Sequence, residues 1–406
     1  MKVRNPRILF IGEGTPVLTT NNPVYYESSE LEVEYINNDD EIFQVINRFK
    51  PDAILSCVQD ESSLPKLFVA PLEIRRKWIN VKEQSSLMGD MAYRVAMHDI
   101  LNITDRKELI SFFTPIYNTK EKLYKTYESL KNQTHNNWEW VMVNDSNDDG
   151  ITLKIAEDLA DKDTRVRVYD FKEKSGGLIG EVKWRAACMC KGEILAELDH
   201  DDLLTPDCAE HLYKASQMFP DAGFFYSDAP EVSIDWKSNI YGEGFALGYG
   251  TYRTDYVMGH EVQSSITPPI NPKTIRHIVG VPNHIRAWRR STYFEIGGHA
   301  RGLTIADDYE LIIRTFLNTK MVHIPKTLYI QFLYNDGTEM NTQDRTRADI
   351  QRRVKTIMLY YNEKIVKRFK ELGVKDWAYE QNPHHPIDTP SIYGEEQGAV
   401  NLVYNG

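Results

Sequence analysis

Hydrophobic and polar residues alternate along the chain in a strand-helix-strand order that begins twice. In the first part, apolar runs predict strands at 7–12, 31–37 and 53–57, and an amphipathic pattern predicts a short helix over 41–49. Gly12 and Gly14 follow the first run without the third glycine of a dinucleotide-binding loop, so we interpret them as a turn. We therefore expect a small α/β domain over residues 1–104.

The same alternation starts again at Arg106 and is longer. Strands are predicted at 110–117, 138–143, 165–171 and 193–198, and helices at 120–132, 151–160 and 180–190. A repeated order of this kind favours a mostly parallel sheet with helices on both faces, which binds its ligands at the carboxyl ends of the strands. We expect this α/β domain to span residues 105–343.

The pattern becomes irregular in the second half of the chain. A strand is predicted at 222–228, but residues 237–283 are rich in Gly, Tyr and Pro without a sustained period, which predicts a long functional loop. Order returns in three predicted segments: a segment at 284–290, a helix near 306–317 and a strand around 321–324. Residues 344–406 are expected to form a charged helical extension over 345–372 and a C-terminal tail.

Composition narrows the possible functions. The formal net charge of −11 argues against a general nucleic-acid binder, because such proteins neutralise phosphates with Lys and Arg. Four irregularly spaced cysteines fit a reducing compartment, and cytoplasmic is the expected location. The sequence shows neither a secretory signal nor an apolar stretch long enough to span a bilayer. The cysteines are Cys57, Cys188, Cys190 and Cys208.

An acidic cluster follows the predicted strand 193–198. Asp199, Asp201 and Asp202 stand where a buried strand opens into a loop at the ligand-binding edge of the sheet. Neighbouring carboxylates repel each other unless a cation joins them, and oxygen ligands of this kind suit Mn²⁺ or Mg²⁺. The alternative is an acidic turn before a helix, with Thr205 as the N-cap and Pro206 as the first helical residue.

Asp145 follows the strand 138–143 at the same predicted edge. A carboxylate there can accept hydrogen bonds from a ribose or a base, as acidic residues at strand ends do in other nucleotide-binding folds. A polar turn stabilised by the Asp145 side chain explains the same local sequence. Both interpretations stay open on these residues alone.

Four ordered segments, ISFFTPIYN, VNDSNDDG, WRAACMCKGEILAELDHDD and ADDYELIIR, resemble the inverting glycosyltransferases of family 2, which have the GT-A fold. The resemblance covers roughly residues 108–335. It implies a metal-dependent enzyme that moves a sugar from a nucleotide-sugar, most simply a UDP-sugar, to a hydroxyl acceptor such as a glycan, lipid-linked sugar or protein. The processive Gln-x-x-Arg-Trp motif is missing from the sequence, which favours single transfer.

The resemblance also assigns roles on the donor side. Pro115 and Tyr117 would lie against the nucleotide base, and Asp145 would bind the base or ribose. Arg185 matches the Arg of an Arg-Asn step that contacts phosphate, although Ala186 replaces the Asn.

At the metal site, the resemblance makes Asp199 and Asp201 the metal-binding pair, with Asp202 supporting the metal or the donor sugar. Family members often add a late histidine, which residues 329–342 lack. Tyr334, Asn335 or water would then substitute for it.

Asp308 is the general base that the resemblance implies, with Asp307 where the family usually has Glu. A carboxylate at a helix N-terminus is held ionised by the helix dipole, as a base requires, although simple charge complementarity also explains one acid here. Gly297 and Gly298 would border the acceptor site, or form only a turn.

Several residues keep two interpretations. Cys188 and Cys190 are expected to be buried packing residues. Two cysteines at this spacing on a helix, without a second pair of Cys or His, make a poor metal site. His284 and the arginines after it would either reach an anionic group or form a solvated strand edge. Among whole-protein functions, a nucleotidyltransferase and a non-catalytic nucleotide-sugar binding protein are the alternatives.

Overall fold

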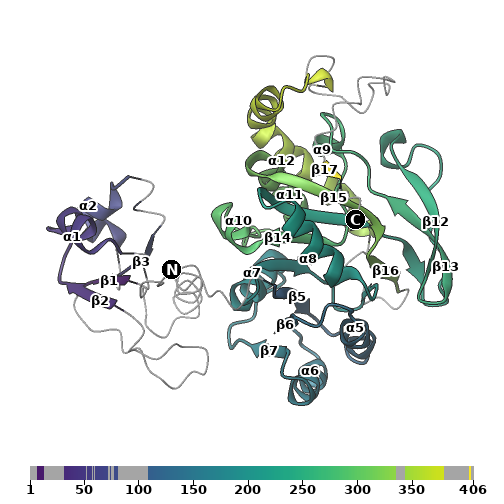
Figure 1. The fold of residues 1–406 in the computed structure, drawn as a ribbon, viewed down its shortest axis with the longest axis horizontal. Helices are drawn as coiled ribbons and strands as arrows, with labels where there is room; N and C mark the ends of the chain where they lie inside the picture. Colours follow the sequence, from purple (N-terminus) through teal and green to yellow (C-terminus); the bar gives the residue numbers. More distant parts are fainter. Residues whose placement is uncertain are drawn as a thin grey trace. The chain divides into compact units, whose positions relative to one another are not determined.

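The computed structural model describes residues 7–12, 32–51, 53–56, 58, 60–71, 74, 77–80, 108–334, 343–378 and 402–403. The chain divides into two compact units, Met1–Asp105 and Arg106–Gly406 (Figure 1). The tail expected after residue 378 lies outside the described residues, apart from a two-residue strand.

The first unit contains a four-stranded parallel sheet in the order β2-β1-β3-β4. Its strands are β1 (Arg7–Ile11), β2 (Glu32–Ile36), β3 (Ala53–Ser56) and β4 (Trp78–Asn80), with helices α1 (Ile42–Phe49) and α2 (Pro65–Phe68). Leu9 and Ile54 of the sheet pack with Ile42 and Leu67 of the helices in one buried core. The predicted strands and helix of this unit are confirmed.

The second unit is built on an eight-stranded sheet in the order β17-β15-β10-β14-β8-β5-β6-β7. Every pairing within it is parallel except those that β14 makes with β10 and β8. The strands are β5 (Ile110–Ile116), β6 (Trp138–Asn144), β7 (Val166–Asp170), β8 (Ile194–Glu197), β10 (Ala222–Asp228), β14 (Arg286–Arg289), β15 (Lys320–Thr327) and β17 (Leu402–Val403). This confirms the predicted mostly parallel α/β fold.

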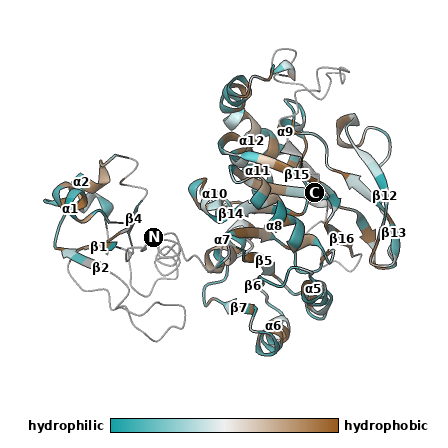
Figure 2. Cartoon of the chain, in the orientation of Figure 1, coloured by the Kyte–Doolittle hydropathy of each residue, from teal (hydrophilic) through white to brown (hydrophobic). Residues whose placement is uncertain are grey.

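Helices surround this sheet. They are α5 (Lys122–Lys131), α6 (Ile151–Lys162), α7 (Ile179–Met189), α8 (Cys208–Met218), α9 (Thr274–His277), α10 (Arg290–Glu295) and α11 (Asp307–Asn318). Figure 2 shows hydrophobic residues concentrated in the central strands and hydrophilic residues on the surrounding helices. Phe112, Trp140 and Phe225 of the sheet are fully buried in the resulting core, together with Leu123 and Leu212 of the helices.

In the second half of the chain, the structure corrects one prediction and excludes one of two alternatives. The expected loop over 237–283 contains an antiparallel hairpin of β12 (Thr251–Val257) and β13 (His260–Ile266). The segment at 284–290 is also not a solvated edge, because β14 lies between β10 and β8, and Arg286 on it is only 3% exposed.

A small sheet of β11 (Glu231–Ser233), β16 (Tyr329–Leu333) and β9 (Leu203–Leu204) lies beside the main sheet. Arg253 of β12 ties the hairpin to β10 by an ion pair with the buried Asp228, whereas its second ion pair, with Asp255, lies within β12 itself. Because the hairpin is tied to the sheet by charge-assisted bonds, it forms part of the rigid scaffold around the site.

The helical extension is α12 (Gln343–Glu371), which packs against α11 and α9 of the second unit. A buried ion pair secures the segment that follows it: Arg276 on α9 donates two hydrogen bonds to Asp376, at 2.5 and 2.9 Å. In the part of the chain that the structure describes, no helix combines the length and the apolar character needed to cross a bilayer.

Candidate active site

A cavity of about 610 Å³ opens at the carboxyl edge of the main sheet. Its walls come from the ends of β5, β6 and β8, from the loop 174–177 with the start of α7, and from β16. This is the edge where parallel sheets bind ligands, since the strand ends leave room between their loops. Pro115, Tyr117, Asp145, Asp199, Asp201 and Asp202 all line the cavity.

The end of the cavity beside β5 and β6 holds the residues expected near the nucleotide. Pro115 and the exposed Tyr117 line it at the end of β5, and Asp145 lines it on the loop after the neighbouring strand β6. Asp145 also organises the neighbouring loop, because its Oδ1 accepts from the Ser175 amide at 2.7 Å and its Oδ2 from the Ser175 hydroxyl at 2.5 Å. The printed hydrogen bonds of the Asp145 side chain thus reach a loop 30 residues further along the chain, which does not support the interpretation of Asp145 as a local polar turn.

Arg185 does not line the cavity. Its guanidinium donates to Glu181 at 2.8 Å and to the Glu173 carbonyl at 2.5 Å. Residues two apart on a helix point in nearly opposite directions, and Lys183 is the cation of α7 that lines the cavity. The expected phosphate contact from Arg185 thus has no support in the geometry, and Lys183 occupies the corresponding place.

Asp199 and Asp201 stand on the turn after β8, on the floor of the cavity. Asp199 Oδ2 lies 3.6 Å from Nε2 of His284, a residue buried beside the ring of Tyr329. Burial raises the pKa of Asp201 and the neighbouring Asp199 charge adds to this, against the opposing effect of His200 and Lys122. Two carboxylates that repel each other fit a site that a divalent cation completes.

Within the described residues, no group of three His, Cys, Asp or Glu side chains is arranged to enclose a metal. This donor set still fits Mg²⁺ or Mn²⁺, which are commonly held by one or two carboxylates together with substrate phosphates and water. Tyr334 donates its hydroxyl to the Asp201 carbonyl at 3.1 Å, and the Lys122 ammonium lies 3.7 Å from the centre of its ring. Asn335 lies outside the described residues.

Asp202 is used within the fold. Its Oδ2 accepts from the Tyr329 hydroxyl and its Oδ1 from the Phe332 amide, both at 2.7 Å. Burial and the charges of Asp201 and Asp199 raise its pKa well above the ordinary value. Both carboxylate oxygens therefore bind the acidic turn to β16, and Asp202 has a structural role beside the site.

Asp308 is the second residue of α11, and it is not among the residues that line the cavity. Its Oδ1 accepts from the Tyr309 amide at 2.7 Å, and its Oδ2 lies 3.2 Å from Arg286 Nη1. Burial acts to raise the pKa of Asp308, but the Arg286 and Lys183 cations outweigh it and hold the pKa below its ordinary value. Its side chain is 24% exposed, so the ionised carboxylate remains accessible.

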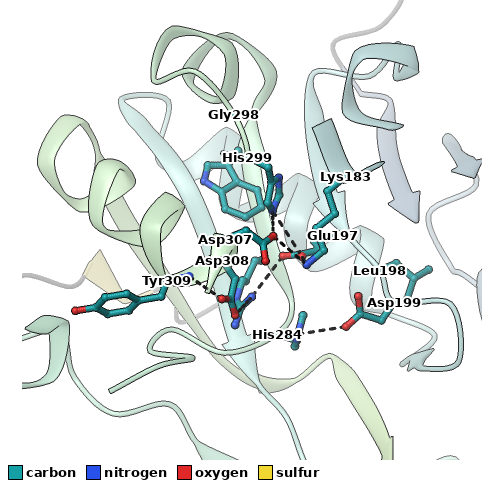
Figure 3. A network of polar contacts seen from close by, with 12 residues as sticks. Lys183, Glu197, Leu198, Asp199, His284, Gly298, His299, Asp307, Asp308 and Tyr309 are labelled. Carbon is teal, nitrogen blue, oxygen red and sulfur yellow. Dashed lines mark hydrogen bonds and ion pairs between the residues drawn. The ribbon is translucent and has the colours of Figure 1, made fainter. Parts of the chain in front are cut away.

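A buried charge network joins this carboxylate to the cavity (Figure 3). Lys183 forms an ion pair with the fully buried Glu197 of β8, and its ammonium lies 3.7 Å from Asp307. Burial acts to lower the pKa of Lys183, but the Glu197 and Asp307 carboxylates raise it above its ordinary value. Arg286 reaches Glu197 at 3.5 Å, so α7, β8, β14 and α11 meet in one network.

The sequence prediction missed Lys183 and Glu197. A signal for Glu197 was present, since a charged residue inside an apolar strand is almost never buried without a partner. Lys183 gave no such signal, because α7 is buried on nearly all sides and has no distinct polar face. Cys188, Cys190 and Cys208 are buried and unpaired, as expected for packing residues.

Residues 111–261 match the model of the glycosyl transferase family 2, so this segment is similar to the glycosyltransferases of that family. The O-antigen biosynthesis protein RfbC of Myxococcus xanthus is 24% identical over 226 residues, which are 55% of this chain and 16% of that protein. Chondroitin synthase of Escherichia coli is 24% identical over 275 residues, which are 68% of this chain and 34% of that protein. The family resemblance is thus confirmed, and the chain spans about a third or less of the length of these relatives.

A likeness to solved structures is also present. The structure of S. aureus TarS 1–349 in complex with UDP-GlcNAc matches with a TM-score of 0.44 and 16% identity, covering 68% of this chain and 77% of that chain.

Proposed function

We propose that this chain is an inverting glycosyltransferase that moves a sugar from a UDP-sugar to a hydroxyl group of an acceptor. One observation carries the proposal: one cavity brings together Asp145 and the Asp199–Asp201 pair. Lys183, which also lines this cavity, lies 3.7 Å from Asp307, the neighbour of Asp308 at the start of α11. The match of residues 111–261 to the family 2 model supports the same reaction class.

On the donor side, Pro115 and Tyr117 supply an apolar wall for the base, and Asp145 can accept from the ribose or base with its remaining lone pairs. Asp199 and Asp201 would hold Mn²⁺ or Mg²⁺ together with the diphosphate. When bound, the cation supplies positive charge that stabilises the leaving diphosphate. The Lys183 ammonium adds a fixed charge in the same wall of the cavity.

On the acceptor side, the Asp308 carboxylate takes the proton of the attacking hydroxyl. The new bond forms at the anomeric carbon while the bond to the diphosphate oxygen breaks with its electron pair, so the configuration inverts. Arg286 holds Asp308 ionised and oriented, and the Tyr309 amide fixes its second oxygen. A base must be unprotonated and aimed before the acceptor arrives, and these two contacts provide both conditions.

The proposed location is the cytoplasm, which the three unpaired buried cysteines support.

The test is a screen of nucleotide-sugars with Mn²⁺ for slow donor hydrolysis, which needs no knowledge of the acceptor. We expect release of UDP from one UDP-sugar, and loss of this activity when EDTA removes the metal. Pyrophosphate as the product would indicate a nucleotidyltransferase instead. UDP binding without turnover of any donor would indicate a non-catalytic nucleotide-sugar binding protein. Full activity in EDTA would contradict the proposed role of the metal.

A further inference from the structure

The outer face of α12 carries a charge opposite to that of the protein as a whole. The chain has a formal net charge of −11, yet residues 349–378 contain eight Lys or Arg against four Asp or Glu. Seven of the cations are exposed, of which Lys375 lies after the end of α12 and six lie on it: Arg352, Arg353, Lys355, Lys364, Lys367 and Lys370. A local reversal of this size marks a surface that attracts an anionic partner.

Three of the six exposed cations on the helix form a stripe with Tyr360, and Arg352, Lys355 and Lys370 lie to one side of it. Arg353, Tyr360, Lys364 and Lys367 follow each other at spacings of seven, four and three residues, which places them on one face. Lys367 is 79% exposed, and its ammonium lies 3.8 Å from the half-exposed Glu371, so the face is basic in sum but contains acidic residues. The opposite side of α12 is used for packing, where Ile365 and Phe369 are buried. The helix is therefore anchored to the second unit by one face and presents the basic face outward.

Two large apolar side chains are exposed among these cations. Tyr360 is 72% exposed and Leu359 is 48% exposed, although the helix has a packed side that could bury such residues. Tyr360 keeps its ring near Lys364, whose ammonium lies 5.6 Å from the ring centre. An aromatic and a leucine between lysines are the residues that enter the headgroup region of a bilayer, while the lysines contact anionic headgroups.

We propose that α12 docks the protein on an anionic membrane surface. The exposed Leu359 and Tyr360 favour a bilayer, whose interface takes up apolar side chains, over an anionic polysaccharide, which offers the lysines charge but no apolar phase. Docking would also orient the site, because α12 packs on α11, whose first residues include Asp308, and Tyr361 donates to Glu310 of α11 at 2.6 Å. The docking itself does not depend on the proposed transfer reaction.

The test is co-sedimentation of the full chain, without donor, with vesicles of phosphatidylcholine that contain or lack phosphatidylglycerol. We expect binding only to the anionic vesicles, weakening as salt is added. The variant Lys364→Glu/Lys367→Glu should lower the partition coefficient by roughly 25-fold or more, since each basic residue near the surface contributes about 1 kcal/mol. Leu359→Ser/Tyr360→Ser should also weaken binding, with less change in its salt dependence.

The matched control is Lys131→Glu/Lys237→Glu, which changes the net charge equally at exposed positions outside α12. It should bind as the wild type does. Equal binding to both kinds of vesicle, or an equal loss in the control, would overturn the proposal. Binding to soluble heparin without binding to vesicles would assign the face to an anionic polysaccharide. A circular dichroism spectrum of each variant shows whether α12 is retained.

Discussion

The buried ion pair between Lys183 and Glu197 gives the sharpest stability prediction. Replacing Lys183 by Met keeps a side chain of similar length but removes the cation from a place where it is 7% exposed. Glu197, which is fully buried, then faces Asp307 with less compensating charge. Uncompensated charge inside a protein is strongly unfavourable, because water no longer solvates it.

The magnitude follows from the distances. The 3.7 Å between the Lys183 ammonium and Asp307 corresponds to a Coulomb energy of about 4.5 kcal/mol at an effective dielectric constant of about 20. Removing one partner of a buried ion pair usually lowers the stability of a protein by about 3–5 kcal/mol, and the Coulomb energy falls within this range. We expect Lys183→Met to lower the free energy of unfolding by that amount.

Urea unfolding followed by tryptophan fluorescence measures this, because six of the seven tryptophans lie in the second unit. Lys131→Met is the control: its ion pair with Glu128 is exposed, so the loss should stay below about 1 kcal/mol. The double variant Lys183→Met/Glu197→Gln should recover most of the stability, since a neutral buried pair needs no counter-charge. A Lys183→Met protein as stable as the wild type would refute the reasoning.

Three further predictions follow from other contacts. Arg276→Met breaks the buried pair with Asp376 and should cost about 3–5 kcal/mol in urea unfolding; an unchanged midpoint would contradict this. Burial and nearby cations lower the pKa of His277 to about 4, so stability should fall by at most about 3 kcal/mol as pH drops from about 6.5 to 4. His277→Gln should remove that part of the pH dependence, and identical curves would exclude it. Asp145→Ala should weaken donor binding in calorimetry by about tenfold or more and loosen the loop at Ser175; unchanged affinity would exclude a donor role.

The acidic residues of the site could be predicted from sequence because they follow strands. Asp145 and Asp199 come directly after apolar runs, and parallel strands bring such positions to one edge of a sheet. Side chains on helices were harder to place. Arg185 and Lys183 both lie on α7, and a helix buried on almost every side offers no polarity by which to choose between them.

The hairpin of β12 and β13 escaped prediction for a different reason. Its residues are largely polar, and of the two buried positions of β13, Val262 and Ser264, only one is apolar, so the apolar alternation that marks a half-buried strand is weak. The loop of the hairpin consists of Met258 and Gly259, whose φ angles are both positive, 51° and 88°, as a two-residue hairpin loop requires. A glycine at this position between two β-prone runs was the usable indication.

Asp308→Asn tests the central claim most directly, because it removes the proposed base while keeping the shape of the side chain. The measurement compares UDP-sugar binding by calorimetry with the rate of sugar transfer, using Asp158→Asn, an exposed position on α6, as the control. We predict that Asp308→Asn keeps the donor affinity and loses at least about a hundredfold in transfer rate, since a general base contributes that much or more. A folded Asp308→Asn protein that transfers sugar at the wild-type rate would contradict the assignment.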